Sequence, residues 1–501
     1  MTRAHITLDP AFRVASVDRR MFGSFVEHLG RCVYGGIYDP GHAHANDQGF
    51  RTDVLDLVRE LGVSVVRYPG GNFVSGYRWE DGIGPREERP ARLDPAWKTV
   101  ETNAFGVDEF MSWVAESGTE PMMAVNLGSR GLQEACDIVE YCNHPGGTFW
   151  SDLRRKNGSA EPYDIRLWCL GNEMDGSWQV GHKTATEYGR LAAETAKAMR
   201  LIDPRIELVA CGSSNSRMPT FAEWEATVLD HCYEFVDYIS MHVYYEESAD
   251  LRSFLASAVD MDAYIDSVVS TCDYVAAKRR LPKGMRISFD EWNVWYQSHH
   301  RQQQESMEWT EAPGLLQDRY TVADAVVVGD MLLSLLRHAD RVGVACQAQL
   351  VNVIAPIIAE RDGAAWVQTI FHPFRQAAAY AKGTVLRLAV DSPRYETDVY
   401  GDIEAVSAVA TYDEESGDVA VFLVNRDPDA AVSLDVDLRS LGAVRLVEHQ
   451  ALSHDDPHTL SHADTVDALR PRQVDSTSVD ADLVLHTELA PASWNVVRLS
   501  A

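Results

Sequence analysis

The sequence predicts an α/β fold, a (β/α)8 TIM barrel followed by a C-terminal antiparallel, jelly-roll-like β-sandwich. Short apolar runs alternate with helical patterns through residue 350, as expected for βα units around a parallel sheet. After about residue 390, apolar and polar residues alternate and turn signals separate the runs, which is typical of antiparallel strands. We expect residues 1–18 to supply N-terminal strands that join the C-terminal sheet, 19–385 to form the barrel and 386–501 the sandwich.

Eight apolar runs are candidates for the barrel strands. They cover residues 22–27, 63–68, 121–127, 165–171, 206–211, 236–243, 285–291 and 341–349. Amphipathic helices are expected between them, for example over 183–202 and 261–280, and the second ends in three cations, which the helix dipole favours. A doubly wound open sheet is the alternative, but no strand end supplies the glycine-rich phosphate loop that often marks that fold.

The later part of the chain is expected to be rich in β-structure. Strands of the sandwich are predicted over 405–411, 418–425 and 493–499, and two strand-like pieces, 4–8 and 12–17, precede the barrel. Residues 292–320 contain no convincing long element but are rich in Gln, His and Trp. A disordered linker would be poor in aromatic residues, so we expect part of this stretch to cover a functional pocket.

The charge balance argues against two classes of partner. With 45 basic and 75 acidic residues, the formal net charge is −30, which repels nucleic acid and anionic membranes. Residues 1–20 lack an apolar signal segment and no later apolar stretch is long enough for a membrane span, so we expect a cytoplasmic protein. The 8 cysteines and 17 histidines form no Cys-x-x-Cys or His-Glu-x-x-His motif, so neither a metal nor a cofactor is expected.

Two glutamates stand at the ends of predicted strands. The run 165–171 is followed by Asn172 and Glu173, and the run 285–291 ends at Glu291. Because the carboxyl ends of barrel strands converge on one face, these distant carboxyl groups can meet in one pocket. Glycosidic cleavage needs one carboxylic acid to protonate the leaving oxygen and one carboxylate to attack or to activate water. The pair therefore indicates a glycosidase, in which the Asn172 amide can donate to a sugar hydroxyl.

Polar side chains also stand at or after the ends of other predicted strands, and we expect them on the same face of the barrel as the two glutamates. They are Glu27, Asn72, His242, Tyr244 and Gln349. Each has an ordinary explanation, such as a buried ion pair, a turn residue or a satisfied core histidine, but their common position favours a binding role. Aromatic rings pack on the C–H faces of sugars. Core packing is expected for at least one of the four candidates of this kind, which are Trp97, Trp178, Trp292 and Trp295.

Long motifs surround these residues. They are Glu27-His-Leu-Gly-Arg31, Arg67-Tyr-Pro-Gly-Gly-Asn-Phe-Val-Ser-Gly-Tyr77, Trp79-Glu-Asp-Gly82, Asn143-His144, Cys169-Leu-Gly-Asn-Glu-Met-Asp-Gly176, Gly181-His-Lys-Thr-Ala185, Asp290-Glu-Trp-Asn-Val-Trp-Tyr296 and Ala348-Gln-Leu-Val-Asn352. Across the barrel the chain closely resembles the intracellular α-L-arabinofuranosidases of glycoside hydrolase family 51. Over roughly the last hundred residues the resemblance is one of architecture more than of motif.

The resemblance implies a retaining, exo-acting hydrolase that removes terminal arabinofuranosyl groups from arabinan and arabinoxylan oligosaccharides without a cofactor. It implies that Glu173 is the acid/base and Glu291 the nucleophile. The side chains implied to hold the arabinose are Glu27, Asn72, Asn172, Tyr244 and Gln349, with Trp97, Trp178 and Trp295 as sugar-contacting aromatics. Many members of the family are homohexamers, so a homo-oligomer is expected.

The same residues are also compatible with other functions. Another glycosidase of the same clan, such as an endo-glucanase or β-xylosidase, could use the same carboxyl pair, although a pocket closed by Glu27 and Gln349 favours one terminal sugar over a long chain. A sugar-binding protein without catalysis would share the fold, and a transglycosylating enzyme would share every catalytic residue. In a retaining enzyme we expect the two carboxyl groups about 5–5.5 Å apart.

Overall fold

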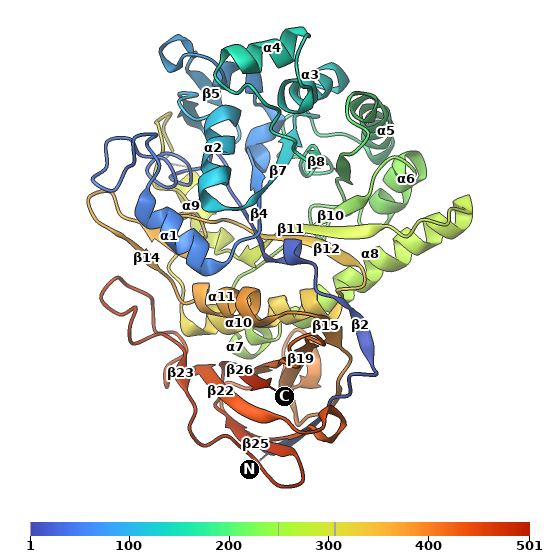
Figure 1. Ribbon diagram of the computed structural model, residues 1–501, viewed down its shortest axis with the longest axis vertical. Coiled ribbons are helices and arrows are strands. Elements are labelled where there is room, and N and C mark those ends of the chain that lie inside the picture. Colours follow the sequence, from blue (N-terminus) through green and yellow to red (C-terminus); the bar gives the residue numbers. More distant parts are fainter. Residues whose placement is uncertain (1, 249, 305–306, 501) are drawn as a thin grey trace.

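Eight parallel strands close into a barrel, which occupies the upper part of the molecule in Figure 1. The computed structural model describes residues 2–248, 250–304 and 307–500. The barrel strands, in chain order, are β3 (Gly23–Phe25), β4 (Val65–Tyr68), β7 (Glu120–Val125), β8 (Leu167–Leu170), β9 (Glu207–Ala210), β10 (Tyr238–Tyr245), β11 (Arg286–Val294) and β12 (Val342–Gln347). Each falls on one of the eight predicted runs, and β12 closes the barrel against β3. The predicted fold class is confirmed.

The barrel strands read as continuous apolar runs because both of their faces are buried. Every residue of β4, β8 and β12 is buried. One set of their side chains, including Val65, Leu167 and Val344, packs inside the barrel, and the other set packs under the surrounding helices. The barrel is therefore a solid core, and only its ends are open for a site.

Helices cover the outside of the barrel (Figure 1). They are α1 (Thr52–Leu61), α2 (Val107–Ser117), α3 (Leu132–Asn143), α4 (Phe149–Lys156), α5 (Ala185–Ile202), α6 (Glu223–Cys232), α7 (Leu251–Leu255), α8 (Ala258–Arg279), α9 (Gln297–Gln304), α10 (Val322–Arg337) and α11 (Phe371–Tyr380). The predicted helix 183–202 is α5, which starts with a capping box between Thr184 and Glu187. The predicted helix 261–280 is α8, and Arg280 ends it in the left-handed conformation.

Two stacked sheets form the lower part of the molecule in Figure 1. The first has the order β16 (Ala389–Asp391), β1 (Thr2–Thr7), β21 (Val432–Asp437), β25 (Val484–Leu489) and β24 (Ser478–Val479). The second has the order β2 (Arg13–Ser16), β15 (Thr384–Leu386), β19 (Val406–Tyr412), β20 (Val419–Asn425), β26 (Ser493–Ser500), β22 (Arg445–Leu452) and β23 (Arg472–Gln473). Among the described strands of these sheets, one pair departs from the predicted antiparallel arrangement: β1 runs parallel to β21.

Short elements complete the chain. Three two-stranded ribbons pair β5 (Arg92–Asp94) with β6 (Thr99–Glu101), β13 (Ile357–Ala359) with β14 (Ala365–Val367), and β17 (Arg394–Thr397) with β18 (Gly401–Glu404). The 3-10 helices are η1 (Arg19–Phe22), η2 (Asn72–Ser75), η3 (Trp79–Gly82), η4 (Arg86–Glu88) and η5 (Arg439–Leu441). A division between barrel and sandwich near residue 385 stays a prediction.

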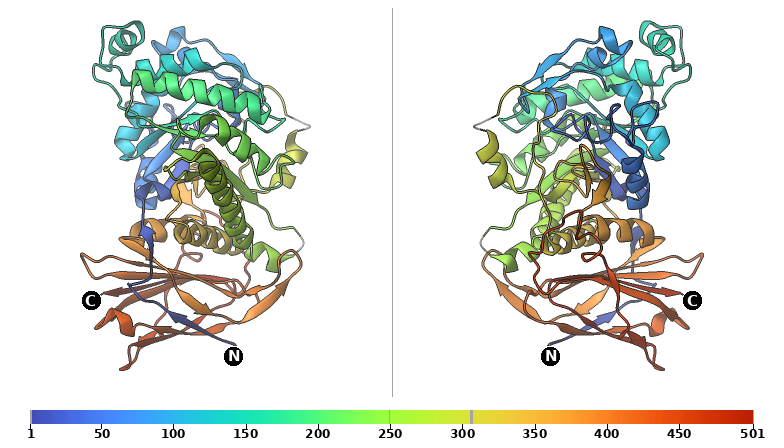
Figure 2. Two further views of the ribbon diagram at one scale, coloured as in Figure 1. Left: turned by 90° about the vertical axis from the view of Figure 1, so that its right-hand side faces the viewer. Right: turned by 90° about the vertical axis from the view of Figure 1, so that its left-hand side faces the viewer.

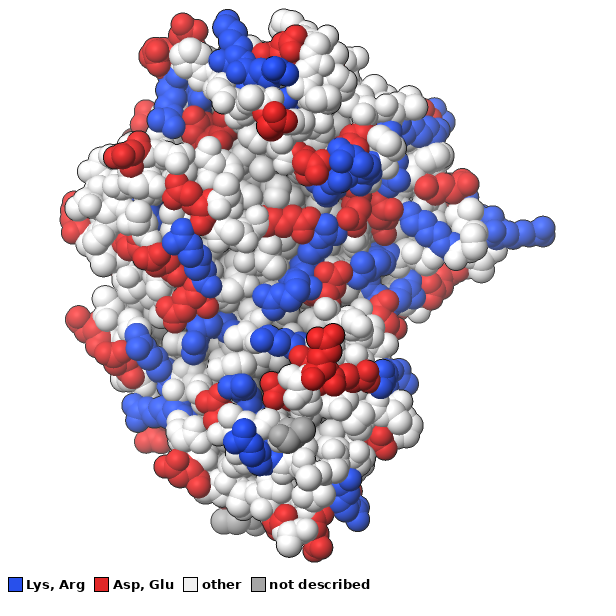
Figure 3. All heavy atoms as spheres, viewed as in Figure 1, with Lys and Arg blue, Asp and Glu red and all other residues white. Residues whose placement is uncertain are grey.

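The stretch 292–320, where no long element was predicted, contains the end of a strand and a short helix. Strand β11 continues to Val294 and α9 follows it, although residues 305 and 306 of the stretch lie outside the described part. Across the described helices, none is both long and apolar enough to cross a membrane. On the face shown in Figure 3, acidic and basic side chains are interspersed rather than gathered by sign.

Candidate active site

A pocket of about 730 Å³ opens at the carboxyl ends of the barrel strands. It brings together nine of the twelve side chains that the sequence singled out, namely Glu27, Asn72, Trp97, Glu173, Trp178, Tyr244, Glu291, Trp295 and Gln349. Two more, Asn172 and His242, are buried and do not line the pocket; Asn172 accepts a hydrogen bond from Arg67, and His242 contacts the lining residue Glu173. The fourth tryptophan, Trp292, is completely buried in the core and does not line the pocket.

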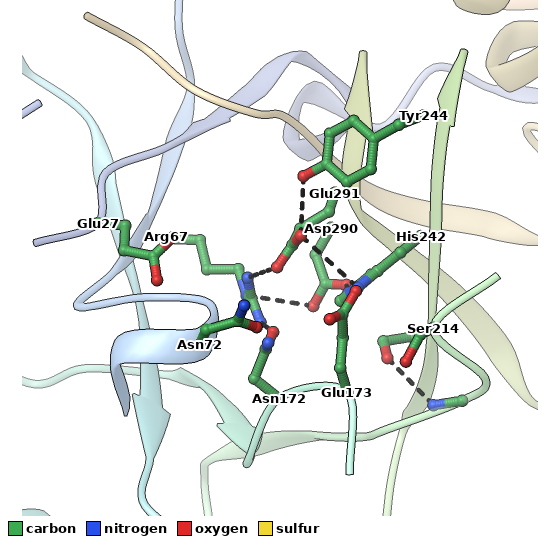
Figure 4. A network of polar contacts seen from close by, with 12 residues as sticks. Glu27, Arg67, Asn72, Asn172, Glu173, Ser214, His242, Tyr244, Asp290 and Glu291 are labelled. Atoms are coloured by element: carbon green, nitrogen blue, oxygen red, sulfur yellow. Dashed lines mark hydrogen bonds and ion pairs between the residues drawn. The ribbon is translucent and has the colours of Figure 1, made fainter. Parts of the chain in front are cut away.

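Glu173 follows β8 in a backbone conformation that few residues other than glycine adopt. Gly171, with φ of 90°, ends the strand, and Glu173 itself has φ of 44°. Its Oε1 lies 2.9 Å from Nδ1 of His242, and its Oε2 accepts a hydrogen bond of 2.8 Å from the indole N–H of Trp178. The largely buried carboxyl group is thus fixed from two sides, as Figure 4 shows for His242.

Glu291 lies within β11, where both of its oxygens accept hydrogen bonds. Arg67 donates through Nη1 to Oε1 at 2.8 Å, and the Tyr244 hydroxyl donates to Oε2 at 2.8 Å. One carboxylate oxygen of Glu291, one of Glu173 and a ring nitrogen of His242 all lie within 4.8 Å of one another (Figure 4). The two carboxyl groups therefore face the same small volume.

Arg67 connects three side chains at the base of the pocket. Besides Glu291, it donates through Nη2 to Oδ1 of Asn172 at 2.6 Å, and its Nε lies 3.5 Å from Oδ2 of Asp290. Burial would lower the pKa of Arg67, but the negative charges of Asp290 and Glu291 raise it well above its ordinary value. The Arg67 guanidinium therefore keeps its positive charge where it contacts the Glu291 carboxyl group.

His242 lies between three carboxyl groups. Its Nε2 is 3.0 Å from Oδ1 of Asp290, and its Nδ1 faces Glu173 at 2.9 Å and Glu291 at 3.7 Å. Burial lowers the pKa of His242, but the charge of Glu291 and the hydrogen bonds to Asp290 and Glu173 outweigh it and raise the pKa to about 10. At neutral pH the ring is therefore an imidazolium that donates from both nitrogens.

The environments of the two glutamates differ in charge. Burial and then the negative charge of Glu291 raise the pKa of Glu173 above its ordinary value, although the hydrogen bond from His242 opposes them. Glu291 instead has the Arg67 guanidinium as a direct partner. The raised pKa of Glu173 suits a proton donor, and the contacts from Arg67 and Tyr244 hold the Glu291 carboxyl group in one orientation, as a nucleophile requires.

Glu27 lies on the side of the two glutamates away from Ser214, where it is the centre of a second group of hydrogen bonds (Figure 4). Its Oε1 accepts hydrogen bonds from the Phe73 backbone and from the indole of Trp97, each at 2.9 Å, and its Oε2 accepts one from Gln349 at 3.1 Å. Burial raises the pKa of Glu27 to about 8. A Cβ atom at Gly71 would lie 2.6 Å from Oε2 of Glu27, so a larger residue there would push this carboxyl group out of its position.

Two amides next to the glutamates are fixed by neighbours. Asn172 accepts from Arg67, while its Nδ2 is buried and has no hydrogen-bond partner among the described residues. An unpartnered buried donor beside an open pocket suits a ligand oxygen. Asn72 accepts a hydrogen bond from Gln179, whose side chain also accepts from Ser75 at 2.7 Å and reaches Glu173 at 3.5 Å.

The aromatic residues line the pocket to different extents. Trp97 is only 7% exposed and donates its indole N–H to Glu27, whereas Trp178 is 49% exposed and donates to Glu173. The ring of Trp295 packs edge-on against Tyr244 at 5.1 Å between centroids. Trp178 and Trp295 therefore offer ring surface to a ligand, and Trp97 mainly orients a carboxyl group.

Three residues of this network were not singled out from the sequence: Arg67, Asp290 and Gln179. Arg67 lies inside an apolar strand, and the partner that explains it, Glu291, is 224 positions away. An arginine within a buried strand is itself a signal, since such a charge is almost never buried without a partner. Asp290, which precedes Glu291, is buried and paired in the same way, and no comparable pattern marks Gln179.

The geometry of Glu173, His242 and Glu291 also resembles a set of metal ligands. The donor set does not suit a cation, however. Both oxygens of Glu291 already accept from Arg67 and Tyr244, and the raised pKa of His242 favours a proton on the nitrogen that faces the glutamates. A metal would have to displace the imidazolium proton and the guanidinium contact. The cluster is better suited to acid–base and nucleophilic chemistry by its two carboxyl groups.

Most of the chain is similar to known protein families and to individual relatives. Residues 57–276 match the model of the "Alpha-L-arabinofuranosidase 1 domain", and residues 290–493 match that of the "Alpha-L-arabinofuranosidase C-terminal domain". A protein of Streptomyces lividans named "Intracellular exo-alpha-(1->5)-L-arabinofuranosidase" is 56% identical over 99% of this chain and 75% of its own length. A protein of the same name from Acetivibrio thermocellus is 52% identical over 100% of both chains. A solved family 51 α-L-arabinofuranosidase from Bifidobacterium longum is 48% identical, covers 99% of both chains and has a TM-score of 0.95.

Proposed function

Because the chain belongs to the α-L-arabinofuranosidases of glycoside hydrolase family 51, we propose that it releases terminal α-L-arabinofuranosyl groups from oligosaccharides with retention of configuration. The single observation that supports this best is the facing pair Glu173 and Glu291, with oxygens within 4.8 Å of each other. Retaining glycosidases hold their carboxyl groups about 5–5.5 Å apart, whereas inverting ones leave about 6.5–9.5 Å for a water molecule.

In the first half-reaction, Glu291 attacks the anomeric carbon while Glu173 gives its proton to the leaving glycosidic oxygen. The carbon–oxygen bond to the leaving group breaks and a bond to the Glu291 carboxylate forms. Arg67 and Tyr244 hold the attacking carboxylate in place through its two oxygens. The products are a free alcohol, which has taken up the Glu173 proton, and an arabinosyl ester of Glu291.

In the second half-reaction, Glu173 removes a proton from water and the hydroxide oxygen displaces Glu291. Esterification removes the charge of Glu291, and that charge is one cause of the raised pKa of Glu173. The pKa of Glu173 therefore falls once the intermediate forms, and the same residue can act as a base. Two displacements at one carbon restore the original configuration.

The sugar itself is bound at the Glu27 end of the pocket. Glu27, Gln349 and Asn72 provide acceptors and donors for arabinose hydroxyls, and the free Nδ2 of Asn172 donates to a hydroxyl next to the reacting carbon. The nearly buried Trp97 closes the pocket behind Glu27. A closed end admits a chain terminus and not the middle of a polymer, which supports the exo-acting mode.

Replacing Asp290 by asparagine tests the charge network behind the acid. The variant loses the charged partner of His242 Nε2, so the pKa of His242 falls from about 10. A His242 ring that carries less positive charge lowers the pKa of Glu173 less, so the high-pH limb of kcat/KM, which follows loss of the Glu173 proton, moves to higher pH. We expect the maximum of kcat/KM to fall by about tenfold, less than the roughly 10²–10⁴-fold that general acid catalysis supplies.

The measurement is a pH profile of kcat/KM for Asp290→Asn and for the matched surface variant Asp273→Asn, whose aspartate pairs with Arg341 and is 57% exposed. The control is expected to keep the parental profile. A high-pH limb that stays in place, or moves to lower pH, in Asp290→Asn would show that His242 does not tune Glu173.

The substrate assignment is tested by comparing aryl α-L-arabinofuranosides and linear α-1,5-linked arabino-oligosaccharides with β-glucan and aryl β-xylosides. The names of the two close relatives make the α-1,5 linkage the first choice. We propose that the protein acts on such oligosaccharides in the cytoplasm, as the word "intracellular" in those names supports, and that it forms a homohexamer. We expect turnover of the arabinosides, one terminal sugar at a time. Internal cleavage of β-glucan without turnover of arabinosides would favour another enzyme of the clan, and binding without turnover would favour a sugar-binding protein.

A further inference from the structure

The pocket is larger than one arabinofuranosyl group requires. A volume of about 730 Å³ lies in the range of roughly 300–1,000 Å³ that holds ligands well beyond one small sugar. Its far wall is made by residues after β9 and β10, by α7, and by the turn between β17 and β18, which belongs to the C-terminal part of the chain. The turn contributes Val399 and Tyr400. Figure 2 shows the orange chain near residue 400 beside the green segment of α7.

This wall lies on the leaving-group side of the reaction. In the view of Figure 4, Glu27 and Ser214 are on opposite sides of the two glutamates, and Ser214 follows β9 in the part of the pocket that leads to the far wall. The proton donor of a glycosidase faces the glycosidic oxygen. If the terminal arabinose lies against Glu27, the rest of the oligosaccharide extends past Glu173 toward the far wall.

The turn between β17 and β18 is fixed to the barrel by its backbone. The Asp398 N–H donates to Oδ2 of Asp250 at 3.2 Å, and the Val399 N–H donates to Oγ of Ser253 at 3.0 Å. Asp250 is also the N-cap of α7, since it accepts from the first backbone N–H groups of that helix. The turn therefore has a defined place in the pocket wall and is not a loose surface loop.

The two side chains of the turn that line the pocket are apolar or aromatic, whereas many of the wall residues around them are polar. Val399 is 67% exposed although its backbone is anchored, and Tyr400 packs on a small buried cluster that contains Tyr395, Ile403 and Ala256. The neighbouring wall residues carry hydroxyl, amide or charged groups, namely Asn215, Arg217, Glu246, Ser248, Asp250 and Ser257. An apolar and aromatic patch among hydrogen-bonding groups matches the C–H face and the hydroxyl edge of a sugar ring.

We propose that the β17–β18 turn, through Val399 and Tyr400, forms with α7 a binding site for the leaving-group sugars of an oligosaccharide. The inference rests on the proposed function and adds to it that the C-terminal part of the chain helps to select the substrate. It follows that the turn contributes to kcat/KM for oligosaccharides and contributes little for substrates whose leaving group is a small aryl ring.

The test compares Tyr400→Ala and Val399→Asp with the parent on two substrates, an aryl α-L-arabinofuranoside and an α-1,5-linked arabinotriose. We expect kcat/KM for arabinotriose to fall at least about fivefold, the effect of losing one apolar contact, while the value for the aryl substrate stays within about twofold. Glu396→Ala is the matched control, because Glu396 is an exposed residue of β17 that does not line the pocket.

If Tyr400→Ala lowers the melting temperature, the two kcat/KM values of Val399→Asp test the proposal instead. Val399 is largely exposed, so its replacement leaves the buried cluster intact. An unchanged ratio of the two kcat/KM values, or an equal loss on both substrates, overturns the proposal. Failure of the proposed function would look different, because the parent enzyme would then not hydrolyse the aryl arabinofuranoside at all.

Discussion

Glu291→Ala is expected to lower kcat for every arabinoside by about 10⁴-fold or more, which is the usual loss of rate when a catalytic nucleophile is removed. The variant keeps Arg67, Tyr244 and Glu173 but has no oxygen that can attack the anomeric carbon. Added azide should restore turnover of an aryl α-L-arabinofuranoside and give the β-azide, because azide enters from the face that the missing carboxylate occupied. The measurements are steady-state rates and the configuration of the azide product.

Loss of a buried ion pair with Arg67 also destabilises the fold, so the melting temperature of Glu291→Ala must be recorded beside its rate. Glu291→Gln, which keeps the shape of the side chain, is the matched variant and should be as inactive. A folded Glu291→Ala enzyme with full activity, or an α-azide product, would contradict a nucleophilic role for Glu291.

Glu173→Ala is expected to separate substrates by their leaving group. For natural oligosaccharides, whose alkoxide leaves poorly without a proton, kcat/KM should fall by about 10²–10⁴-fold. For an aryl arabinofuranoside with a good leaving group, kcat/KM should change little, while kcat falls because water lacks its base in the second step. Azide should now accelerate turnover and give the α-azide, since it attacks the arabinosyl ester of Glu291.

The pH profile gives a second readout of the same variant. In the proposed mechanism Glu173 must be protonated, and its raised pKa places the loss of activity at higher pH than an ordinary carboxyl group would. Activity falls as the pH rises through that pKa, and Glu173→Ala should lack this limb on aryl substrates. An equal loss on both substrate types with an unchanged profile would assign Glu173 a structural role instead.

The sequence predicted the barrel well because its strands are buried on both faces and read as continuous apolar runs between helical patterns. All eight runs coincide with barrel strands, and the polar residues that follow them meet in one pocket. The short helix α9 was not predicted, since Gln297–Gln304 is polar throughout and lacks an apolar stripe. The parallel pairing of β1 with β21 joins the two ends of the chain, and no local pattern specifies it.

The parts of the site that sequence reasoning missed depend on contacts between distant segments. Arg67 and Asp290 lie within strands, where their neighbours in sequence are apolar or belong to the barrel wall, and only the folded barrel brings them together. The same holds for Val399, whose place in the pocket follows from the packing of a C-terminal turn on α7. Patterns along the chain specify elements, whereas these contacts arise from the arrangement of elements in space.

The configuration of the first product tests the central claim, which is that Glu173 and Glu291 act together in a double displacement. Proton NMR should follow hydrolysis of an aryl α-L-arabinofuranoside and record the anomeric signal of free arabinose before mutarotation. The α-anomer is expected first, because the short distance between the two carboxyl groups leaves no room for a water molecule to attack from the nucleophile side. Initial release of the β-anomer would contradict a covalent intermediate on Glu291 and, with it, the roles proposed for both glutamates.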